Sequence, residues 1–534
     1  MRRFNSYGPI DTEEHYYAPR EALIANTCTQ LTGPNPQKGG HFITVWAPRQ
    51  TGKTWLMQQV MRRLHEDERF STLKINMERL KYEEDPVVVA NSVAQKIGEG
   101  LGKQFGDIES QDQFQEIFRK RVLEKPLILI LDEFDALPEE AINFLVSTFR
   151  NIYIDRMDES TIPARDKRYL LHAVALIGVR SVLGIENIKG SPFNVQRSLH
   201  IPNLTFEEVR DIFRWYSQDS GQDIESRVID RLFEETRGQP GLTCWFGELM
   251  TEGFEGYQND RSQPIGMNDF EKVYAAATYT LPNNNILNII SKARGQDVMP
   301  LVLEMFKTGQ TIEFAFDEPT INTLYMNGIA DKEEAPDNRY FLRFSCPFIQ
   351  KRLFNYFSRD TFKHLGQLLE PFTDTEPAIT PTRLDIREFM KLYQSYLDKN
   401  KSWLFKDVPR RADLRVYEAI FHFNLYSFMD EFLRNRGGRV IPEFPTGNGK
   451  IDLLIRYNNA IYGIELKSFT DQATFNKSLQ QAARYGKHLE MEEIYLVNFV
   501  DFIDTENREL YEKDTFISDL SITVKPIFIQ TGNP

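Results

Sequence analysis

The sequence has little of what would place the protein in an oxidising compartment or a membrane. Its three cysteines, Cys28, Cys244 and Cys346, are widely spaced and fit buried small hydrophobic residues better than disulfides or a zinc site. The eight histidines show no paired spacing typical of metal ligands. No apolar run approaches the roughly 18 residues of a membrane span, and residues 1–5 (MRRFN) do not lead into the apolar segment of a signal peptide. We therefore expect a cytoplasmic protein without membrane contact.

The chain also lacks an excess of positive charge. Its formal net charge is −13, with 64 lysines and arginines against 77 aspartates and glutamates. Any contact with nucleic acid must therefore be a local basic patch rather than a field over the whole surface. Contents of 41% hydrophobic and 26% charged residues are those of a globular protein. A length of 534 residues exceeds one ordinary core, so we expect about three or four domains.

Residues 41–64 carry the pattern of strand, phosphate-binding loop and helix. A β-type run with the apolar residues Phe42, Ile43, Val45 and Trp46 precedes a loop that ends in the sequence GKT, and apolar residues at helical spacing follow. Such a loop turns backbone N–H groups toward phosphate at a helix N-terminus, where the dipole favours negative charge. Lys53 would contact the β- and γ-phosphates of ATP, and the Thr54 hydroxyl would hold Mg²⁺. Ala47 stands where the pattern has glycine. The expected nucleotide-binding loop comprises Ala47, Pro48, Arg49, Gln50, Thr51, Gly52, Lys53 and Thr54.

A second part of the nucleotide site is expected further along the chain. Residues 127–131 (LILIL) are typical of a strand buried on both faces of a parallel sheet. Asp132 and Glu133 follow at its carboxyl end, where open α/β sheets bind ligands. We expect Asp132 to bind Mg²⁺ through water and Glu133 to polarise the attacking water. A further apolar strand, residues 170–178, ends near Arg180, the candidate for sensing the γ-phosphate.

Alternating strands and helices up to residue 180 predict a doubly wound parallel α/β sheet. Residues 1–200 would form this P-loop core, and the helical residues 201–264 would form a lid on the nucleotide. Residues 15–17 (HYY) lie in a polar N-terminal arm. This arm either packs on the first domain or contacts the adenine side of the nucleotide.

Residues 265–370 predict a separate small unit of helix, hairpin and helix, the outline of a winged-helix-like module. Its hairpin tip is acidic, so a role in joining domains is favoured over DNA contact. Residues 371–383 are rich in proline and threonine and form a predicted linker. The remaining residues, 384–534, would form a C-terminal domain.

The C-terminal domain carries a second group of chemically active residues. Residues 450–466 predict two strands joined by a two-residue turn, which would place Asp452 and Glu465 opposite each other. Glu465 and Lys467 are two residues apart and so point to one face of their strand. Two carboxylates and a lysine are the minimum for metal-assisted phosphodiester hydrolysis: the acids hold Mg²⁺, and the lysine orients water or stabilises developing charge.

The neighbouring helices add residues to this group. Glu418 and His422 share a face of a long helix predicted over residues 413–434, and Gln481 and Tyr485 share a face of the following helix. Isolated pairs of this kind are usually surface ion pairs. Their occurrence together with the expected strands favours a catalytic site. His422 is assigned to packing or hydrogen bonding rather than to metal binding.

Six segments of the first half resemble the prokaryotic AAA-like ATPases of the P-loop superfamily. They are FNSYGPIDTEEHYYAPR, WAPRQTGKT, LDEFDAL, IGVRSV, SPFNVQRSLHIPNLT and TRGQPGL, in order over about residues 4–250. Alanine at the first loop position is tolerated in that family. The resemblance implies nucleotide binding by Lys53 and Thr54, with Mg²⁺ coordination and hydrolysis by Asp132 and Glu133. It also implies a homo-oligomer through the ATPase domain, in which a neighbouring subunit completes the site.

Three C-terminal segments, EFPTGNGKIDLLI, IELKSF and QAARY, resemble the PD-(D/E)XK nuclease superfamily, in a smaller and looser set of matches. Ile451 stands where the superfamily pattern has proline, a common departure. The metal ligands that this resemblance implies are Glu418, Asp452 and Glu465. The catalytic residues that it implies are Glu418, Asp452, Glu465, Lys467, Gln481 and Tyr485.

Together these features predict an α/β multidomain protein. It would comprise a P-loop NTPase parallel sheet with a helical lid, a small winged-helix-like module and a C-terminal α/β restriction-endonuclease-like domain. The predicted function is an ATP-hydrolysing, Mg²⁺-dependent nuclease whose ATPase domain gates cleavage of nucleic acid, with DNA the expected substrate. The resemblance implies a prokaryotic defence or mobile-element context. One alternative is an ATP-driven switch whose nuclease-like domain recognises nucleic acid or a partner without cutting. Another is an initiator-like ATPase that uses the winged-helix-like module on DNA.

Overall fold

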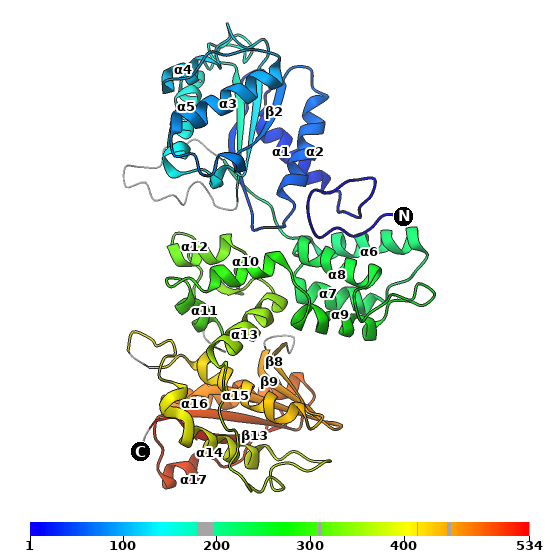
Figure 1. Cartoon of the computed structure of the whole chain (residues 1–534), viewed down its shortest axis with the longest axis vertical. Coiled ribbons are helices and arrows are strands. Elements are labelled where there is room, and N and C mark those ends of the chain that lie inside the picture. The colour runs from blue at the N-terminus through cyan, green and yellow to red at the C-terminus, as the bar shows by residue number, and fades with distance from the viewer. Residues whose placement is uncertain (179–196, 308–311, 414, 446–449, 533–534) are drawn as a thin grey trace. The chain divides into compact units, whose positions relative to one another are not determined.

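The structure is a computed structural model that describes residues 1–178, 197–307, 312–413, 415–445 and 450–532. Packing contacts divide the chain into two compact units (Figure 1). The first unit comprises Met1–Asn285 and Tyr325–Gly328, and the second comprises Ile286–Leu324 and Ile329–Pro534. Among the described residues, no helix combines the length and the apolar character needed to cross a membrane.

A five-stranded sheet, parallel throughout, forms the centre of the first unit. The strand order is β2-β3-β4-β1-β5. The strands are β1 (Phe42–Trp46), β2 (Ser71–Asn76), β3 (Leu127–Asp132), β4 (Leu171–Gly178) and β5 (Arg197–His200). Every residue of β1, β3 and β4 is buried, as expected for a parallel sheet covered on both faces. The predicted parallel α/β sheet of a P-loop fold is therefore confirmed.

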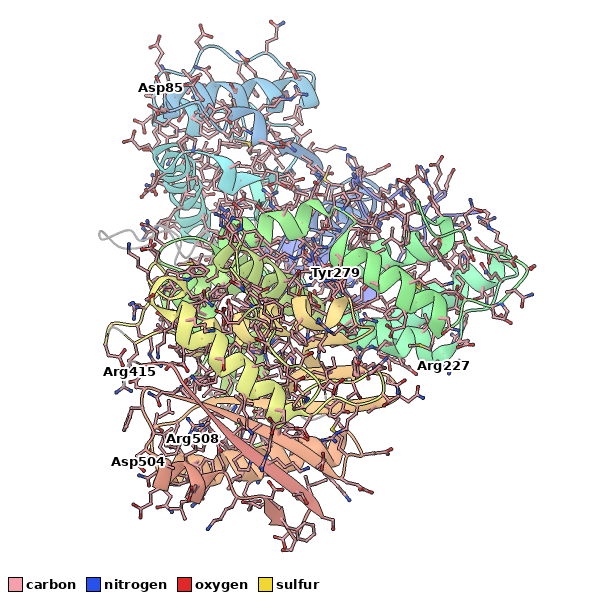
Figure 2. All side chains as sticks on the ribbon, turned by 60° about the horizontal axis from the view of Figure 1, so that its bottom comes forward. Asp85, Arg227, Tyr279, Arg415, Asp504 and Arg508 are labelled. Carbon is pink, nitrogen blue, oxygen red and sulfur yellow. The ribbon has the colours of Figure 1, made fainter. Side chains whose placement is uncertain are left out.

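Helices cover both faces of this sheet (Figure 1). α1 (Glu21–Thr32) and α2 (Lys53–His65) pack on one face. α3 (Pro86–Leu101), α4 (Gln111–Glu116) and α5 (Glu139–Asp158) pack on the other, and the short helices η1 (Glu78–Leu80) and η2 (Phe134–Ala136) follow β2 and β3. Asp85 lies at the start of α3 (Figure 2). It accepts a hydrogen bond from Val87 N at 2.8 Å and so fixes this start, with Pro86 at the first helical position. α5 extends well past its predicted end at residue 150, because Ile152 continues its buried face.

Four further helices of the first unit follow the sheet. They are α6 (Phe206–Ser220), α7 (Ser226–Thr236), α8 (Pro240–Glu252) and α9 (Met267–Tyr279). α9 packs on α7 and α8, and the Phe246 and Phe270 rings stack 5.9 Å apart. The contact division of the chain therefore falls after Asn285, beyond the predicted boundary at residue 264.

The N-terminal arm packs against these helices. The Phe4 ring lies 4.8 Å from Phe213, and the Tyr16 ring lies 5.7 Å from Trp215. Tyr17 lies 5.6 Å from the ring of Trp55 on α2, the helix that follows the phosphate-binding loop. These contacts favour the arm-packing interpretation of the aromatic residues.

The second unit begins with a helix, hairpin and helix arrangement. Its elements are α10 (Asn284–Ala293), α11 (Met299–Met305), α12 (Pro319–Met326), β6 (Ala330–Glu334), β7 (Tyr340–Phe344) and α13 (Pro347–Thr361). β6 and β7 pair as an antiparallel hairpin. α13 packs on α15, and Phe354 lies 5.9 Å from Phe306 and 5.0 Å from Phe423. The hairpin-bearing segment and the helix before the C-terminal sheet therefore share one core.

A six-stranded mixed sheet forms the rest of the second unit, in the order β12-β13-β11-β10-β9-β8. Its strands are β8 (Arg439–Pro445), β9 (Lys450–Tyr457), β10 (Ala460–Ser468), β11 (Glu493–Val500), β12 (Thr515–Ile517) and β13 (Ile522–Gln530). The helices are α14 (Ile386–Leu404), α15 (Glu418–Arg434), α16 (Gln472–His488) and α17 (Thr505–Tyr511). Residues 371–383 contain no helix or strand, and Tyr457 Oη donates a hydrogen bond to Thr380 O at 2.7 Å.

α15 begins at Glu418 rather than at residue 413 as predicted. Before this helix, Arg410 and Val416 form a β-bridge and Arg411 N donates to Arg415 O at 2.8 Å. This backbone pairing excludes a helix there, and Glu418 consequently occupies the first turn of α15.

Candidate functional site

The phosphate-binding loop joins β1 to α2. Gly52 adopts a φ of 89° at the residue before α2, a conformation that glycine allows at little cost. The Lys53 ammonium lies inside the loop, where Nζ donates to Ala47 O at 2.7 Å and to Pro48 O at 2.8 Å. Burial lowers the pKa of Lys53 to about 8, although Glu133 and nearby aspartates act in the opposite direction. Thr54 follows as the second residue of α2.

The start of α8 contacts the same loop. Gln239 Nε2 donates to Arg49 O at 3.2 Å, and Gly241 N donates to Gln50 O at 3.0 Å. A Cβ atom at Gly241 would lie 2.6 Å from the Gln50 side chain, so glycine permits this close approach. The segment TRGQPGL carries part of the family resemblance, but its contact with the phosphate-binding loop was not predicted from the sequence.

Asp132 and Glu133 lie at the carboxyl end of β3, as predicted. Asp132 is buried and accepts a hydrogen bond from Glu133 N at 3.1 Å. Lys74 on the neighbouring strand β2 forms an ion pair with Asp132, with Nζ 2.7 Å from Oδ2. Burial, together with the charge of Asp132, raises the pKa of Glu133. The electrostatic effect of both carboxylates on Lys53 places them near the phosphate-binding loop. Arg180 lies outside the described residues.

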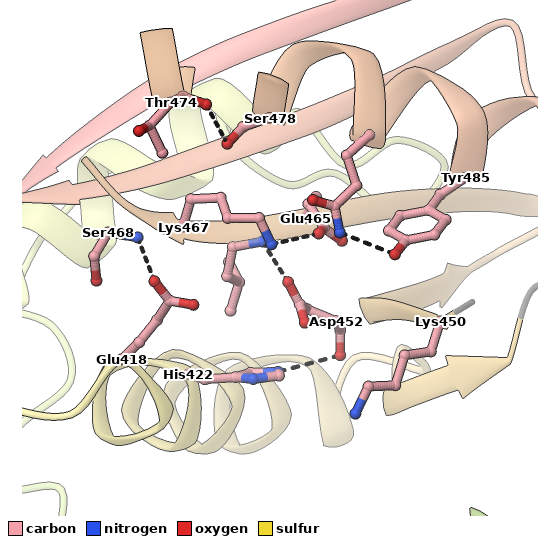
Figure 3. Close-up of polar contacts among 12 residues, drawn as sticks. Glu418, His422, Lys450, Asp452, Glu465, Lys467, Ser468, Thr474, Ser478 and Tyr485 are labelled. Carbon is pink, nitrogen blue, oxygen red and sulfur yellow. Dashed lines mark hydrogen bonds and ion pairs between the residues drawn. The ribbon is translucent and has the colours of Figure 1, made fainter. Parts of the chain in front are cut away.

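The second candidate site lies on β9 and β10 of the second unit (Figure 3). The two strands pair in the predicted register, from Tyr457 with Ala460 to Leu453 with Ile464. Asp452 lies one residue beyond this pairing. Its side chain, rather than its backbone, bonds to β10: Oδ2 accepts a hydrogen bond from Leu466 N at 2.7 Å. The Asp452 carboxylate is thereby fixed between the strands, directly beside Glu465.

Glu465 and Lys467 form a buried ion pair on the same strand, with Lys467 Nζ 2.6 Å from Glu465 Oε1. Burial alone would lower the pKa of Lys467, but Glu465, Asp452 and Glu418 together raise it above its ordinary value. Lys467 is therefore a firmly protonated cation among three carboxylates.

Helices on both sides add the remaining predicted residues. Glu418 Oε2 on α15 accepts a hydrogen bond from Ser468 N at 2.6 Å, and burial raises the pKa of this carboxyl group. On α16, Gln481 Nε2 donates to Tyr485 Oη at 2.9 Å. Burial and then Glu465 raise the pKa of Tyr485 to about 12. The structure thus gathers all six residues predicted for the C-terminal site around the ends of β9 and β10.

Two partners of these residues were not predicted from the sequence. Lys74 lies on an ordinary half-polar strand, and nothing in its spacing indicates an ion pair with Asp132. Glu443 on β8 is buried, and its Oε1 lies 3.7 Å from His422 Nδ1. A carboxylate buried in an apolar strand is unusual, but only the tertiary structure shows what it faces.

Comparison with known families identifies the first site. Residues 37–163 match the family model of the AAA domain. This segment contains the phosphate-binding loop, Asp132 and Glu133, and it is an AAA-domain P-loop ATPase for which ATP is the expected ligand.

Solved structures with similarity to the chain include the following three. A Walker-type ATPase of Pyrococcus abyssi is 14% identical with a TM-score of 0.41, covering 66% of this chain and 99% of its own. The ORC2 protein of Aeropyrum pernix is 15% identical with a TM-score of 0.39, covering 65% and 97%. The ORC1 protein of Aeropyrum pernix, solved in complex with DNA, is 15% identical with a TM-score of 0.33, covering 63% and 92%. Similarities at these scores carry no conclusion about function. No curated protein matches the chain.

Proposed function

We propose that this chain is an ATP-hydrolysing, Mg²⁺-dependent nuclease in which the AAA-domain ATPase gates cleavage of DNA. The observation that carries the proposal is the buried group of Asp452, Glu465 and Lys467 at the ends of two paired strands. Isolated surface ion pairs are common, but buried charges require a specific reason because desolvation is costly. The proposed setting is prokaryotic defence or mobile-element biology.

The residues of the C-terminal site fit a Mg²⁺ ion. Asp452, Glu465 and Glu418 present carboxylate oxygens, the ligands that Mg²⁺ prefers. The bound ion would polarise the scissile phosphate and lower the pKa of the attacking water. Lys467, held in its protonated form, would stabilise negative charge that develops on the phosphate oxygens rather than act as a base. Tyr485 and Gln481, which are hydrogen-bonded to each other on α16, would donate hydrogen bonds to the substrate.

The residues of the AAA domain fit Mg²⁺-ATP. Backbone N–H groups of residues 47–54 would surround the phosphates, Lys53 would bind the β- and γ-phosphates, and Thr54 and Asp132 would hold Mg²⁺. Glu133, whose pKa is raised, would orient and deprotonate the attacking water. We further propose that Arg180 senses the γ-phosphate and that the ATPase domains assemble as a homo-oligomer.

The test is cleavage of linear and circular DNA by the full chain with Mg²⁺, with and without ATP. Asp452→Asn keeps the side-chain volume but removes a ligand charge, so cleavage should fall by about a hundredfold or more. Lys53→Ala should abolish the effect of ATP on cleavage. Glu506→Gln changes an exposed carboxylate of the same unit and is the matched control.

The outcomes separate the proposal from its alternatives. Equal cleavage by the parent and Asp452→Asn would refute the assignment of this site. DNA binding by the parent without any cleavage would favour a switch that recognises nucleic acid. DNA binding that survives removal of residues 384–534 would instead indicate the winged-helix-like module. RNA of the same sequence, assayed in parallel, tests the choice of substrate.

A further inference from the structure

A second group of buried polar side chains lies directly beside Asp452. His422 on α15, Glu443 on β8 and Asp452 on β9 each offer one ligand atom, and these atoms lie within 4.8 Å of one another. Their exposed fractions are 3%, 7% and 2%. None of the roles proposed for the nuclease site uses His422 or Glu443.

The hydrogen bond of His422 defines which ring nitrogen is available. Nε2 lies 3.2 Å from the backbone oxygen of Asp452, an acceptor, so Nε2 carries the hydrogen (Figure 3). In the neutral form of the ring, the other nitrogen, Nδ1, presents a lone pair.

That lone pair faces a carboxylate oxygen. Glu443 Oε2 accepts a hydrogen bond from Gln350 Nε2 at 2.6 Å and an ion pair from Lys450. Glu443 Oε1 is buried and has no hydrogen-bond partner among the described residues, and it lies 3.7 Å from His422 Nδ1. Two buried acceptors that face each other are unfavourable unless a proton or a cation lies between them.

We propose that His422, Glu443 and Asp452 hold a divalent cation of the Zn²⁺ or Mn²⁺ class, distinct from the Mg²⁺ of the nuclease site and sharing Asp452 with it. Imidazole and carboxylate ligands together suit these ions better than Mg²⁺. Two ligands about 2.1 Å from a tetrahedral metal are about 3.4 Å apart, so the observed 3.7 Å requires only a small inward movement.

The ion would connect α15, β8 and β9 at the residue where β9 separates from β10. It would bind a carboxylate oxygen of Asp452 and so orient this carboxylate for the nuclease site. The competing arrangement is a proton on Glu443, since burial, against the effect of Lys450, raises the pKa of that carboxyl group. A metal titration distinguishes the two arrangements, because only the first one binds a metal ion.

The test uses the full chain, stripped of metal with a chelator and titrated with Co²⁺ in the absence of nucleotide and nucleic acid. Nitrogen-containing, low-coordinate Co²⁺ sites absorb visible light much more strongly than hydrated Co²⁺. Glu443→Gln replaces the facing oxygen with an amide that can donate to Nδ1, so this variant should fold. His422→Gln keeps a donor for Asp452 O and removes Nδ1. Glu465→Gln is the matched control, because it alters a carboxylate of the nuclease site and leaves His422, Glu443 and Asp452 unchanged.

We expect the parent and Glu465→Gln to show a saturating Co²⁺ band that Zn²⁺ displaces. Glu443→Gln and His422→Gln should both bind Co²⁺ more weakly than the parent, by about tenfold or more. Zn²⁺ should also raise the melting temperature of the parent and of Glu465→Gln, but not that of Glu443→Gln. Absence of the band in the parent, or an unchanged band in Glu443→Gln, would overturn the proposal. No readout depends on DNA cleavage, so failure of the proposed nuclease function would leave this result unaffected.

Discussion

Replacement of Lys74 by methionine is the sharpest test of the electrostatics at the ATPase site. Lys74 Nζ lies 2.7 Å from Asp132 Oδ2, and the exposed side-chain fractions are 22% for Lys74 and 4% for Asp132. The pair is therefore largely screened from water, unlike a surface ion pair. Methionine keeps the unbranched stem of lysine but removes the ammonium group. The Asp132 carboxylate would then be buried without this cation.

The expected loss follows from the strength of a charge-assisted hydrogen bond. Such bonds contribute roughly 1.5–3 kcal/mol when the partner left behind is buried and charged. We therefore expect the free energy of unfolding of the first unit to fall by about 2 kcal/mol. For a unit of this size the corresponding fall in melting temperature is roughly 3–4 °C.

Binding of Mg²⁺-ATP should reverse part of this loss. If Asp132 holds Mg²⁺, the ion and the Lys74 ammonium compete for the same carboxylate, so removing Lys74 favours the ion. Lys74→Met should consequently show a larger rise in melting temperature on addition of Mg²⁺-ATP than the parent does. Differential scanning calorimetry with and without the ligand measures both effects.

A matched exposed pair in the same unit supplies the control. Lys103 and Glu124 form an ion pair at 2.8 Å, but the Glu124 side chain is 84% exposed. Lys103→Met should change stability by less than about 1 kcal/mol. The reasoning is refuted if Lys74→Met proves as stable as the parent without ligand, or if Mg²⁺-ATP stabilises both proteins equally.

Two further predictions concern one unit each. Burial lowers the pKa of His172 from 6.5 to about 3. The contribution of neutral His172 to the free energy of unfolding is therefore fully present above pH 6.5. It is lost as the pH drops toward 3, by up to about 1.4 kcal/mol per pH unit, because only the unfolded state takes up the proton. His172→Gln should weaken this dependence in melting curves at pH 5 and 7, and an identical slope would contradict it. Phe354 is fully buried, so Phe354→Ala should lower the stability of the second unit by about 3–5 kcal/mol in urea unfolding. Tyr82→Ala, at an exposed residue of the first unit, should leave the urea unfolding transition of the second unit unchanged.

The sequence was most informative where local rules decide the structure. The strand pair of the second unit was predicted in its correct register, because a two-residue turn at Asn458 and Asn459 determines which residues pair. Asn458 adopts a φ of 51°, which asparagine tolerates better than most residues. The phosphate-binding loop was predicted for the same reason, since its function depends on a short continuous segment.

The contacts that were not predicted join distant segments. Gln350 reaches Glu443 from α13, and Gln239 reaches the phosphate-binding loop from α8. Periodicity assigns such residues to a helix face, but the partner depends on how helices pack in three dimensions. The start of α15 was misplaced for a related reason, because the β-bridge between Arg410 and Val416 overrides local helix propensity.

The burial of Lys467 indicates why the second unit maintains charges at this position. A buried ion pair stabilises a protein little, because removing both charges from water costs about as much as their attraction returns. Apolar residues at Asp452, Glu465 and Lys467 would pack into the sheet at least as well. The arrangement is therefore better explained by binding than by stability. Lys467 Nζ contacts Glu465 Oε1 at 2.6 Å, so a cation bound to Glu465 would compete with the ammonium for the charge of this carboxylate and leave the ammonium more available to a phosphate oxygen. Ion binding and substrate binding would then favour each other, which is the property a metal-dependent nuclease requires.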